Sequence, residues 1–162
     1  MAWWKDVNLK FFDREYKDAN ADMRQDLDKA EVIAIFFGAY QNRPSRILVH
    51  FLQKFHKNVR QMFGSRLQVI FVPMDEAEKD TQDFVKTLHG DWMVVPWSSQ
   101  STRRNVRNQY NVINFPWITV VKNSPEGLLV TQEGKEDVQE LGTDAFQKWI
   151  TLAKTTRKTT TM

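Results

Sequence analysis

Unbroken apolar runs alternate with amphipathic segments along this chain. Residues 32–37 read Val-Ile-Ala-Ile-Phe-Phe and end at Gly38, a pattern typical of a strand buried on both faces of a sheet. Apolar residues at helical spacing follow from 47 to 62, and Pro44 suits the first turn of a helix because that position needs no amide donor. We therefore expect a central strand followed by a long helix that ends at Gly64.

The rest of the pattern predicts further strands and helices in alternation. A second buried strand is expected at 67–72, where Pro73 ends it. The order of elements predicts an α/β protein, a three-layer α/β/α sandwich whose central mixed β-sheet begins parallel and ends in an antiparallel hairpin. The other expected elements are helices at 75–88, at 101–110 with Ser101 as the cap and at 143–153 with Thr143 as the cap, an edge or connecting piece at 93–97, and hairpin strands at 118–121 and 128–132.

Length and composition indicate one folded unit with two appendages. The 162 residues suffice for a single core, and 41% apolar residues exclude wholesale disorder. We expect an aromatic and charged N-terminal extension at 1–29, a folded domain at 30–153 and a basic flexible tail at 154–162. No apolar stretch is long enough to span a bilayer, and the acids near the N-terminus argue against a secretory signal or a mitochondrial presequence. We therefore expect a soluble, cytoplasmic protein.

Charge is segregated along the chain, although the net charge is only +3. Residues 32–74 carry six basic residues and no acid, whereas 75–91 carry six acids and two lysines. This segregation predicts opposed charged patches on the surface. The expected basic patch consists of Arg43, Arg46, Arg103, Arg104 and Arg107.

Three segments carry a family resemblance. Residues 35–44, Ile-Phe-Phe-Gly-Ala-Tyr-Gln-Asn-Arg-Pro, lie where tryparedoxin and nucleoredoxin, members of the thioredoxin superfamily, have a strand followed by Trp-Cys-Pro-Pro-Cys. Residues 69–76 with 91–97 resemble their strand, acidic helix and Trp-x-x-x-Pro-Phe segment, and 110–118 resemble their loop into the cis-proline strand. In this order and spacing the three segments are fairly specific, and the resemblance covers about residues 30 to 150. It implies a thioredoxin-like fold in which the Phe115-Pro116 peptide is cis.

The chain departs from these families at the residues that perform their chemistry. It contains no cysteine: Gln41 and Pro44 stand in the places of the two cysteines, and Tyr40 in that of the tryptophan. Disulfide exchange requires a thiolate, which neither an amide nor a pyrrolidine can replace. We therefore expect no thioredoxin-type oxidoreductase activity. No Gly-rich phosphate loop or Ser/His/Asp motif offers another familiar enzymatic function.

No cofactor or metal is expected either. The three histidines, His50, His56 and His89, lack an i, i+4 pair, and no acid between 32 and 74 completes a site around the first two. The acids at the start of the helix expected at 75–88 favour its dipole, so we interpret them as a cap and a solvated face rather than a catalytic pair. Those acids are Asp75, Glu76, Glu78 and Asp80.

The degenerate active-site loop, Tyr40-Gln41-Asn42-Arg43-Pro44, has two interpretations. It ends at a helix N-terminus, where free amides favour an anion, so it could hold a carboxylate of a partner with help from Arg43 and Arg46. Alternatively, the lost active site is now an ordinary solvated helix start.

A peptide-binding groove is the second candidate site. In the resembled families, residues beside the cis-proline pair with an extended substrate segment, and such pairing needs no thiol. Trp117 fits the core as well as the groove. The candidate groove residues are Trp97, Asn114, Phe115, Pro116 and Trp117, with Tyr40 beside them.

The N-terminal aromatics are a candidate anchor for a partner. Trp3, Trp4, Phe11 and Phe12 precede the resembled domain, and aromatic residues are enriched at protein interfaces. The alternative is an N-terminal helix folded back on its own domain, with residues 9, 12 and 16 on one face. The sequence alone does not separate the two.

These observations favour a redox-inactive structural or adaptor subunit that binds one or more proteins. The basic residues suggest a partner with an acidic surface, and the tryparedoxin resemblance suggests a cytoskeletal or ciliary assembly such as microtubules. Two alternatives stay open: a chaperone-like module that binds peptides in the cis-proline groove, and a nucleic-acid or ribonucleoprotein subunit. The latter ranks lower because residues 1–150 carry equal numbers of acids and bases. No membrane partner is expected.

Overall fold

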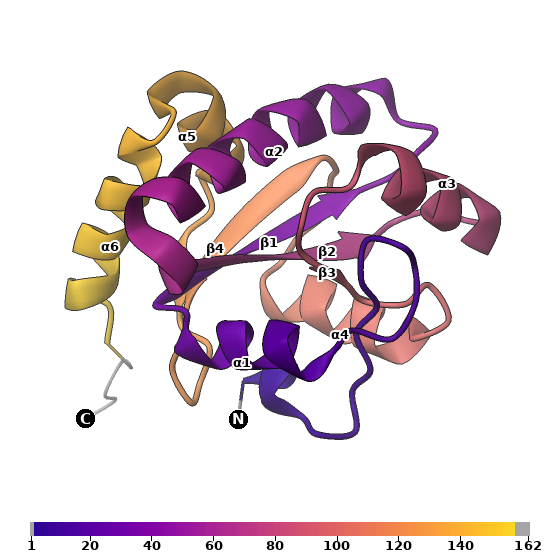
Figure 1. Ribbon diagram of the computed structural model, residues 1–162, viewed down its shortest axis with the longest axis horizontal. Coiled ribbons are helices and arrows are strands. Elements are labelled where there is room, and N and C mark those ends of the chain that lie inside the picture. Colours follow the sequence, from indigo (N-terminus) through magenta and orange to yellow (C-terminus); the bar gives the residue numbers. More distant parts are fainter. Residues whose placement is uncertain (1, 158–162) are drawn as a thin grey trace.

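A five-stranded mixed sheet lies between two layers of helices in the computed structural model, which describes residues 2–157 (Figure 1). The strand order is β3-β2-β1-β4-β5. β1 pairs parallel with β2 and β2 with β3, whereas β4 is antiparallel to both β1 and β5. This is the three-layer mixed-sheet sandwich that the sequence predicts. The elements are η1 Trp3–Lys5, α1 Ala21–Lys29, β1 Val32–Gly38, α2 Arg43–Phe63, η2 Gly64–Arg66, β2 Leu67–Pro73, α3 Glu78–Leu88, β3 Met93–Val94, α4 Gln100–Gln109, β4 Trp117–Lys122, β5 Leu129–Thr131, α5 Gly134–Leu141 and α6 Asp144–Thr155.

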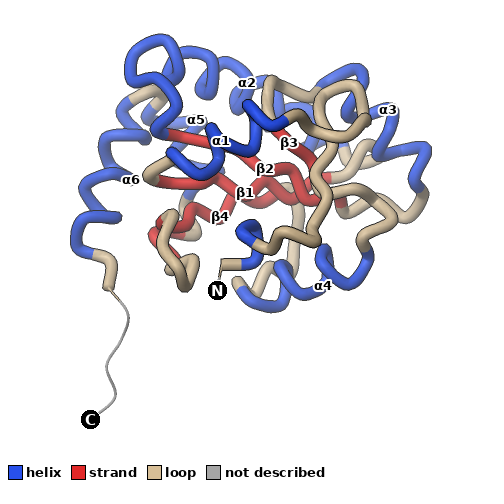
Figure 2. The backbone as a smooth tube through the Cα atoms, turned by 60° about the horizontal axis from the view of Figure 1, so that its bottom comes forward, coloured by secondary structure: helices blue, strands red, loops and turns tan. Residues whose placement is uncertain are grey.

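The central strand β1 separates two apolar clusters. All seven of its residues are buried, and because side chains alternate along a strand, successive residues enter opposite layers. Val32, Ala34 and Phe36 pack with residues of α2, α3, α5 and α6. Ile33 and Phe37 pack with α1, α4 and the N-terminal segment. Figures 1 and 2 show α2 and α6 on one face of the sheet and α1 and α4 on the other.

The N-terminal segment is part of this core rather than an exposed extension. Trp4 is 2% and Phe11 3% exposed, and both belong to the second apolar cluster. Trp4 Nε1 donates to Asn123 Oδ1 at 3.0 Å, and the Asn123 side-chain amide donates to the carbonyl oxygens of Leu27 and Ala30 at 3.0 and 2.7 Å. The segment thus folds back on its own domain, which was one of the two alternatives. It does so as the short helix η1 and a loop before α1, not as a helix with residues 9, 12 and 16 on one face.

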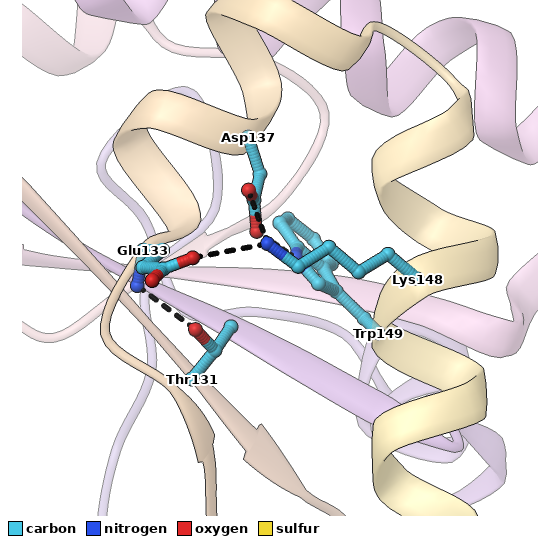
Figure 3. Close-up of polar contacts among 5 residues, drawn as sticks. All are labelled: Thr131, Glu133, Asp137, Lys148 and Trp149. Carbon is cyan, nitrogen blue, oxygen red and sulfur yellow. Dashed lines mark hydrogen bonds and ion pairs between the residues drawn. The ribbon is translucent and has the colours of Figure 1, made fainter.

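The sequence prediction missed α5, whose short apolar side gives little periodicity. Asp137 of α5 is 5% exposed and fastens the helix to α6 (Figure 3). Its carboxylate accepts from Lys148 Nζ at 2.8 Å and from the buried indole Nε1 of Trp149 at 2.9 Å. Lys148 also contacts Glu133 at 3.0 Å, and these acceptors raise the pKa of the lysine. A paired buried carboxylate therefore adds to the apolar contact of Val138 in holding α5 to the domain.

Most other expected elements agree with the structure to within a few residues. The piece expected at 93–97 is the two-residue edge strand β3. Ser101 lies inside α4 rather than at its cap, which is Ser99. The expected tail begins within α6, which extends to Thr155, and residues 158–162 lie outside the described residues. No helix in the described part of the chain is both long and apolar enough to cross a membrane.

Candidate functional site

The degenerate loop between β1 and α2 is closed by its own side chains. Asn42 is the N-cap of α2, and its side-chain oxygen accepts from Ser45 N at 2.8 Å and from Ser45 Oγ at 2.7 Å. The Arg46 guanidinium donates to the Tyr40 carbonyl oxygen and lies 6.0 Å from the centre of the Tyr40 ring. The helix start therefore has a cap already, which favours the interpretation as an ordinary helix start over that as an anion site.

Asp75 holds this loop from the end of β2. The backbone N–H of Tyr40 donates to Asp75 Oδ1 at 2.7 Å, and Thr81 Oγ1 donates to Oδ2 at 2.7 Å. Burial raises the pKa of Asp75, although these two hydrogen bonds act in the opposite direction. Asp75 is only 6% exposed, so the expectation that it belongs to a solvated face was wrong. Its position directly after a buried strand was the signal, because carboxyl ends of parallel strands meet at one edge of the sheet.

A cavity of about 440 Å³ lies beside this loop and reaches the cis-proline segment. The Phe115-Pro116 peptide is cis, as expected, and Phe115 is 37% exposed at the cavity wall. Gln41, which the family resemblance sets at a cysteine position, donates its amide to Asp80 Oδ1 at 3.2 Å. We call this cavity the groove; its lining residues are Ala39, Gln41, Asn42, Met74, Asp75, Glu76, Asp80 and Phe115.

Of the five predicted groove residues, Phe115 alone lines this cavity. Trp97 is half-buried; its indole Nε1 donates to the Asp75 carbonyl oxygen at 2.9 Å. Trp117 donates its Nε1 to Gln132 Oε1 at 2.7 Å and packs against the second apolar cluster. Pro116 is buried and Asn114 is exposed. The two tryptophans are thus structural, while the acids at the end of β2 line the groove instead.

Three of the five arginines of the predicted basic patch donate hydrogen bonds to backbone carbonyl oxygens. Arg103 is half-buried, donates to the Pro73 carbonyl oxygen at 3.1 Å and lies 5.3 Å from the centre of the Trp97 ring. Arg107 donates to the Val112 carbonyl oxygen at 3.2 Å, and Arg46 donates to the Tyr40 carbonyl oxygen. Arg43, Arg104 and Arg107 are exposed, and Arg46 and Arg103 are half-buried. The five arginines therefore do not form one free cationic surface.

The predicted terminal anchor is also corrected. Trp4 and Phe11 are buried in the domain, Trp3 packs beside them with its ring 5.7 Å from that of Trp4, and Phe12 packs against the first cluster. Trp4 and Phe11 are therefore not available to a partner, whereas Trp3 and Phe12 are half-buried. Within residues 2–157 no group of three or more His, Asp or Glu side chains is arranged to hold a metal ion.

Comparison with known proteins shows the family to which this chain belongs. The thioredoxin-like family profile matches residues 29–127. Nucleoredoxin-like protein 1 of Homo sapiens is 26% identical over 141 residues, which are 85% of this chain and 65% of that protein. Nucleoredoxin-like protein 1 of Xenopus laevis is 25% identical, with 85% and 64% covered. The chain therefore spans less than two thirds of the length of these curated relatives.

Solved structures agree with the fold. A thioredoxin from Wuchereria bancrofti superposes with a TM-score of 0.71 at 26% identity, covering 89% of this chain and 95% of that one. Tryparedoxin II from C. fasciculata gives a TM-score of 0.73 at 15% identity, covering 86% and 90%. These matches confirm the fold and the family resemblance expected from the sequence. The chain belongs to the thioredoxin-like family, in a form without cysteine.

Proposed function

We propose that this chain is a redox-inactive, non-enzymatic adaptor domain that binds an extended segment of a partner protein in the groove. The observation that carries the proposal is the groove itself, which joins the former active-site loop to the cis-proline segment in a chain that has no thiol. Binding through such a groove needs shape and hydrogen bonds but no sulfur chemistry. A chain without cysteines therefore cannot carry out disulfide exchange but can still bind a peptide segment.

The groove favours a segment with a basic side chain. Its wall includes the carboxylates of Glu76, which is exposed, and Asp80, which is half-buried, next to the buried Asp75. Arg46 donates to a backbone carbonyl and is absent from the lining. Phe115 adds an apolar side chain to the lining. A lysine or arginine flanked by an apolar residue matches both surfaces, because a cation lying near carboxylates in a partly desolvated cleft gains more than at an open surface.

The test is peptide selection followed by affinity measurement. A library of extended peptides displayed against the full chain is expected to enrich lysine or arginine next to an apolar residue. Fluorescence anisotropy then gives the affinity of one selected peptide for Glu76→Lys, which reverses an exposed charge of the groove. The matched control is Glu136→Lys, an equally charged and exposed change on α5 outside the groove.

We expect Glu76→Lys to weaken binding about tenfold or more and Glu136→Lys to leave it within twofold. Phe115→Ser is expected to weaken the same peptide, while the exposed Leu129→Ser serves as its control. Selection of sequences without basic residues, or equal weakening by both charge reversals, would contradict the groove proposal. Broad weak binding without a consensus would support the chaperone-like alternative instead.

The outer face of α2 supports a docking surface for an acidic partner. The helix contains five Lys and Arg residues and no acid, and Arg43, Lys54 and Lys57 are exposed. Arg60 is exposed too, but it is paired with Asp26 and Asp91. Such a face fits the acidic filament, such as a microtubule, that the sequence suggests as a partner. We therefore include a cytoskeletal or ciliary location in the proposal. Co-sedimentation with microtubules should then fall steeply as salt is raised. The same salt series with RNA tests the nucleic-acid alternative.

A further inference from the structure

A second cavity lies away from the groove, between the C-terminal half of α2 and the loop after α3. Its volume is about 440 Å³, within the range of small-molecule sites. It begins at Gln53, three helical turns beyond the groove loop at Asn42. The lining residues are Arg14, Gln53, His56, Lys57, Arg60, Gln61, His89, Gly90 and Asp91.

His89 lines this cavity and carries an unpaired, buried hydrogen-bond acceptor. Its Nε2 lies 2.8 Å from the Trp92 carbonyl oxygen, which can only accept, so Nε2 carries the proton. Burial lowers the pKa of His89 to about 3, and the positive charge of Arg14 acts in the same direction. The imidazole is therefore neutral, and its Nδ1 is a bare acceptor. That nitrogen is buried and has no hydrogen-bond partner, an arrangement that is costly unless a ligand supplies a donor.

Three cationic side chains lie on the same wall. Arg14, Lys57 and Arg60 line the cavity together with one acid, Asp91. Arg60 Nη1 lies 2.9 Å from Asp91 Oδ2, and its Nη2 lies 3.7 Å from Asp26. The Arg60 charge is thus balanced by acids, whereas Arg14 and Lys57 form no ion pair among the described residues. A ligand in this cavity therefore meets two free cations and one buried acceptor.

We propose that this cavity binds the phosphate group of a small phosphomonoester. A singly protonated phosphate presents anionic oxygens to Arg14 and Lys57 and one P–OH hydrogen to His89 Nδ1, so it satisfies both kinds of wall. A carboxylate or a sulfate near neutral pH offers no such hydrogen. Phosphomonoesters have a second pKa near 6, so the protonated form is abundant in weakly acidic solution. The volume exceeds that of the phosphate alone and leaves room for a small organic group.

The test is isothermal titration calorimetry on the full chain at about pH 6.5. The probes are inorganic phosphate, glycerol phosphate and sulfate. We expect both phosphates to bind and sulfate to bind at least tenfold more weakly, because it leaves Nδ1 unpaired. Tighter binding of glycerol phosphate than of phosphate would identify an ester as the ligand, whereas equal affinity would identify the free ion.

Charge variants and a spectroscopic signal complete the test. Lys57→Glu should abolish phosphate binding, whereas Lys54→Glu, the same change at an exposed position of α2 outside the cavity, should retain it. In a sample with ¹⁵N-labelled histidine, the His89 Nδ1 resonance should move on addition of phosphate and stay in place with sulfate. Equal affinity for phosphate and sulfate, equal weakening by both lysine variants, or an unmoved Nδ1 resonance would overturn the proposal.

Discussion

Two buried histidines should make the stability of this protein fall in mild acid. His56 and His89 are 4% and 3% exposed, and both rings pack against Trp92. Burial is the main cause that lowers their pKa values from 6.5 to about 4 and about 3, with Arg60 and Arg14 adding like-charge repulsion. Below about pH 6.5 the two histidines therefore bind protons in the unfolded chain but not in the folded chain. Stability should be complete above about pH 6.5 and should decrease as the pH falls towards the folded values.

The size of this loss follows from proton linkage. At pH 5 an ordinary histidine is almost fully protonated in the unfolded chain, while both buried rings remain neutral in the folded one. Each ring then lowers the free energy of unfolding by ~2 kcal/mol relative to pH 8, and the pair by ~4 kcal/mol. The free energy of unfolding then changes by at most ~2.7 kcal/mol per pH unit, the value for the uptake of two protons on unfolding. For a domain of ordinary stability this is a large fraction of the total.

The assay is urea unfolding between about pH 8 and pH 5 in buffers free of phosphate, followed by tryptophan fluorescence. His56→Gln removes one titrating ring and should halve the slope. The exposed His50→Gln on the same helix is the control and should leave the slope unchanged. Asp75 acts with the opposite sign, because its raised pKa lets the folded state take up a proton first and gain stability as the pH falls through that value.

A change of less than ~1 kcal/mol over this range would refute the reasoning, since it would mean that the folded rings accept protons as readily as the unfolded ones. An effect of His50→Gln as large as that of His56→Gln would equally show that burial is not the cause.

Substitutions at three further positions test the packing. Asp137→Ala should cost ~2–4 kcal/mol in urea unfolding because it leaves the buried Trp149 indole N–H without an acceptor, whereas Asp137→Asn keeps one acceptor and should cost less. Trp4→Ala should cost ~3–5 kcal/mol, as for a core residue, and a loss below ~1 kcal/mol would return the N-terminal segment to the role of a free anchor. Gly134→Ala should lower the thermal midpoint, because an added Cβ would lie 2.5 Å from Ile118 Cγ2 and 2.7 Å from its carbonyl oxygen.

The sheet and its longest helix could be predicted because their patterns depend on local sequence. β1 is an unbroken apolar run that the sheet buries on both faces, and α2 shows a regular apolar side. α5 could not be found in the same way. Only Gly134, Asp137 and Val138 are buried in it, and its attachment depends on a carboxylate whose partners, Lys148 and Trp149, come later in the chain.

The sequence predicted the location of the candidate site, but most of the residues it assigned to the groove do not line the cavity. The degenerate loop and the cis peptide lie beside one cavity because the family order of segments fixes their place at the edge of the sheet. Side-chain direction was not available from spacing, so Trp97 and Trp117 were assigned to the groove although their indoles bind elsewhere. Asp75 was assigned to solvent, although its partners Tyr40 and Thr81 close over it.

The bond between Trp4 and Asn123 has a consequence for biosynthesis. The two residues are 119 positions apart, so the Trp4 indole N–H has no acceptor in Asn123 until the turn after β4 has left the ribosome. Long-range closure of this kind slows folding and lengthens the time for which apolar side chains are open to solvent. During translation, β1, α2 and β2 can assemble early, while the Trp4 indole N–H still lacks this partner. A ribosome that stalls before residue 123 would therefore leave the N-terminal segment without this bond to the rest of the domain.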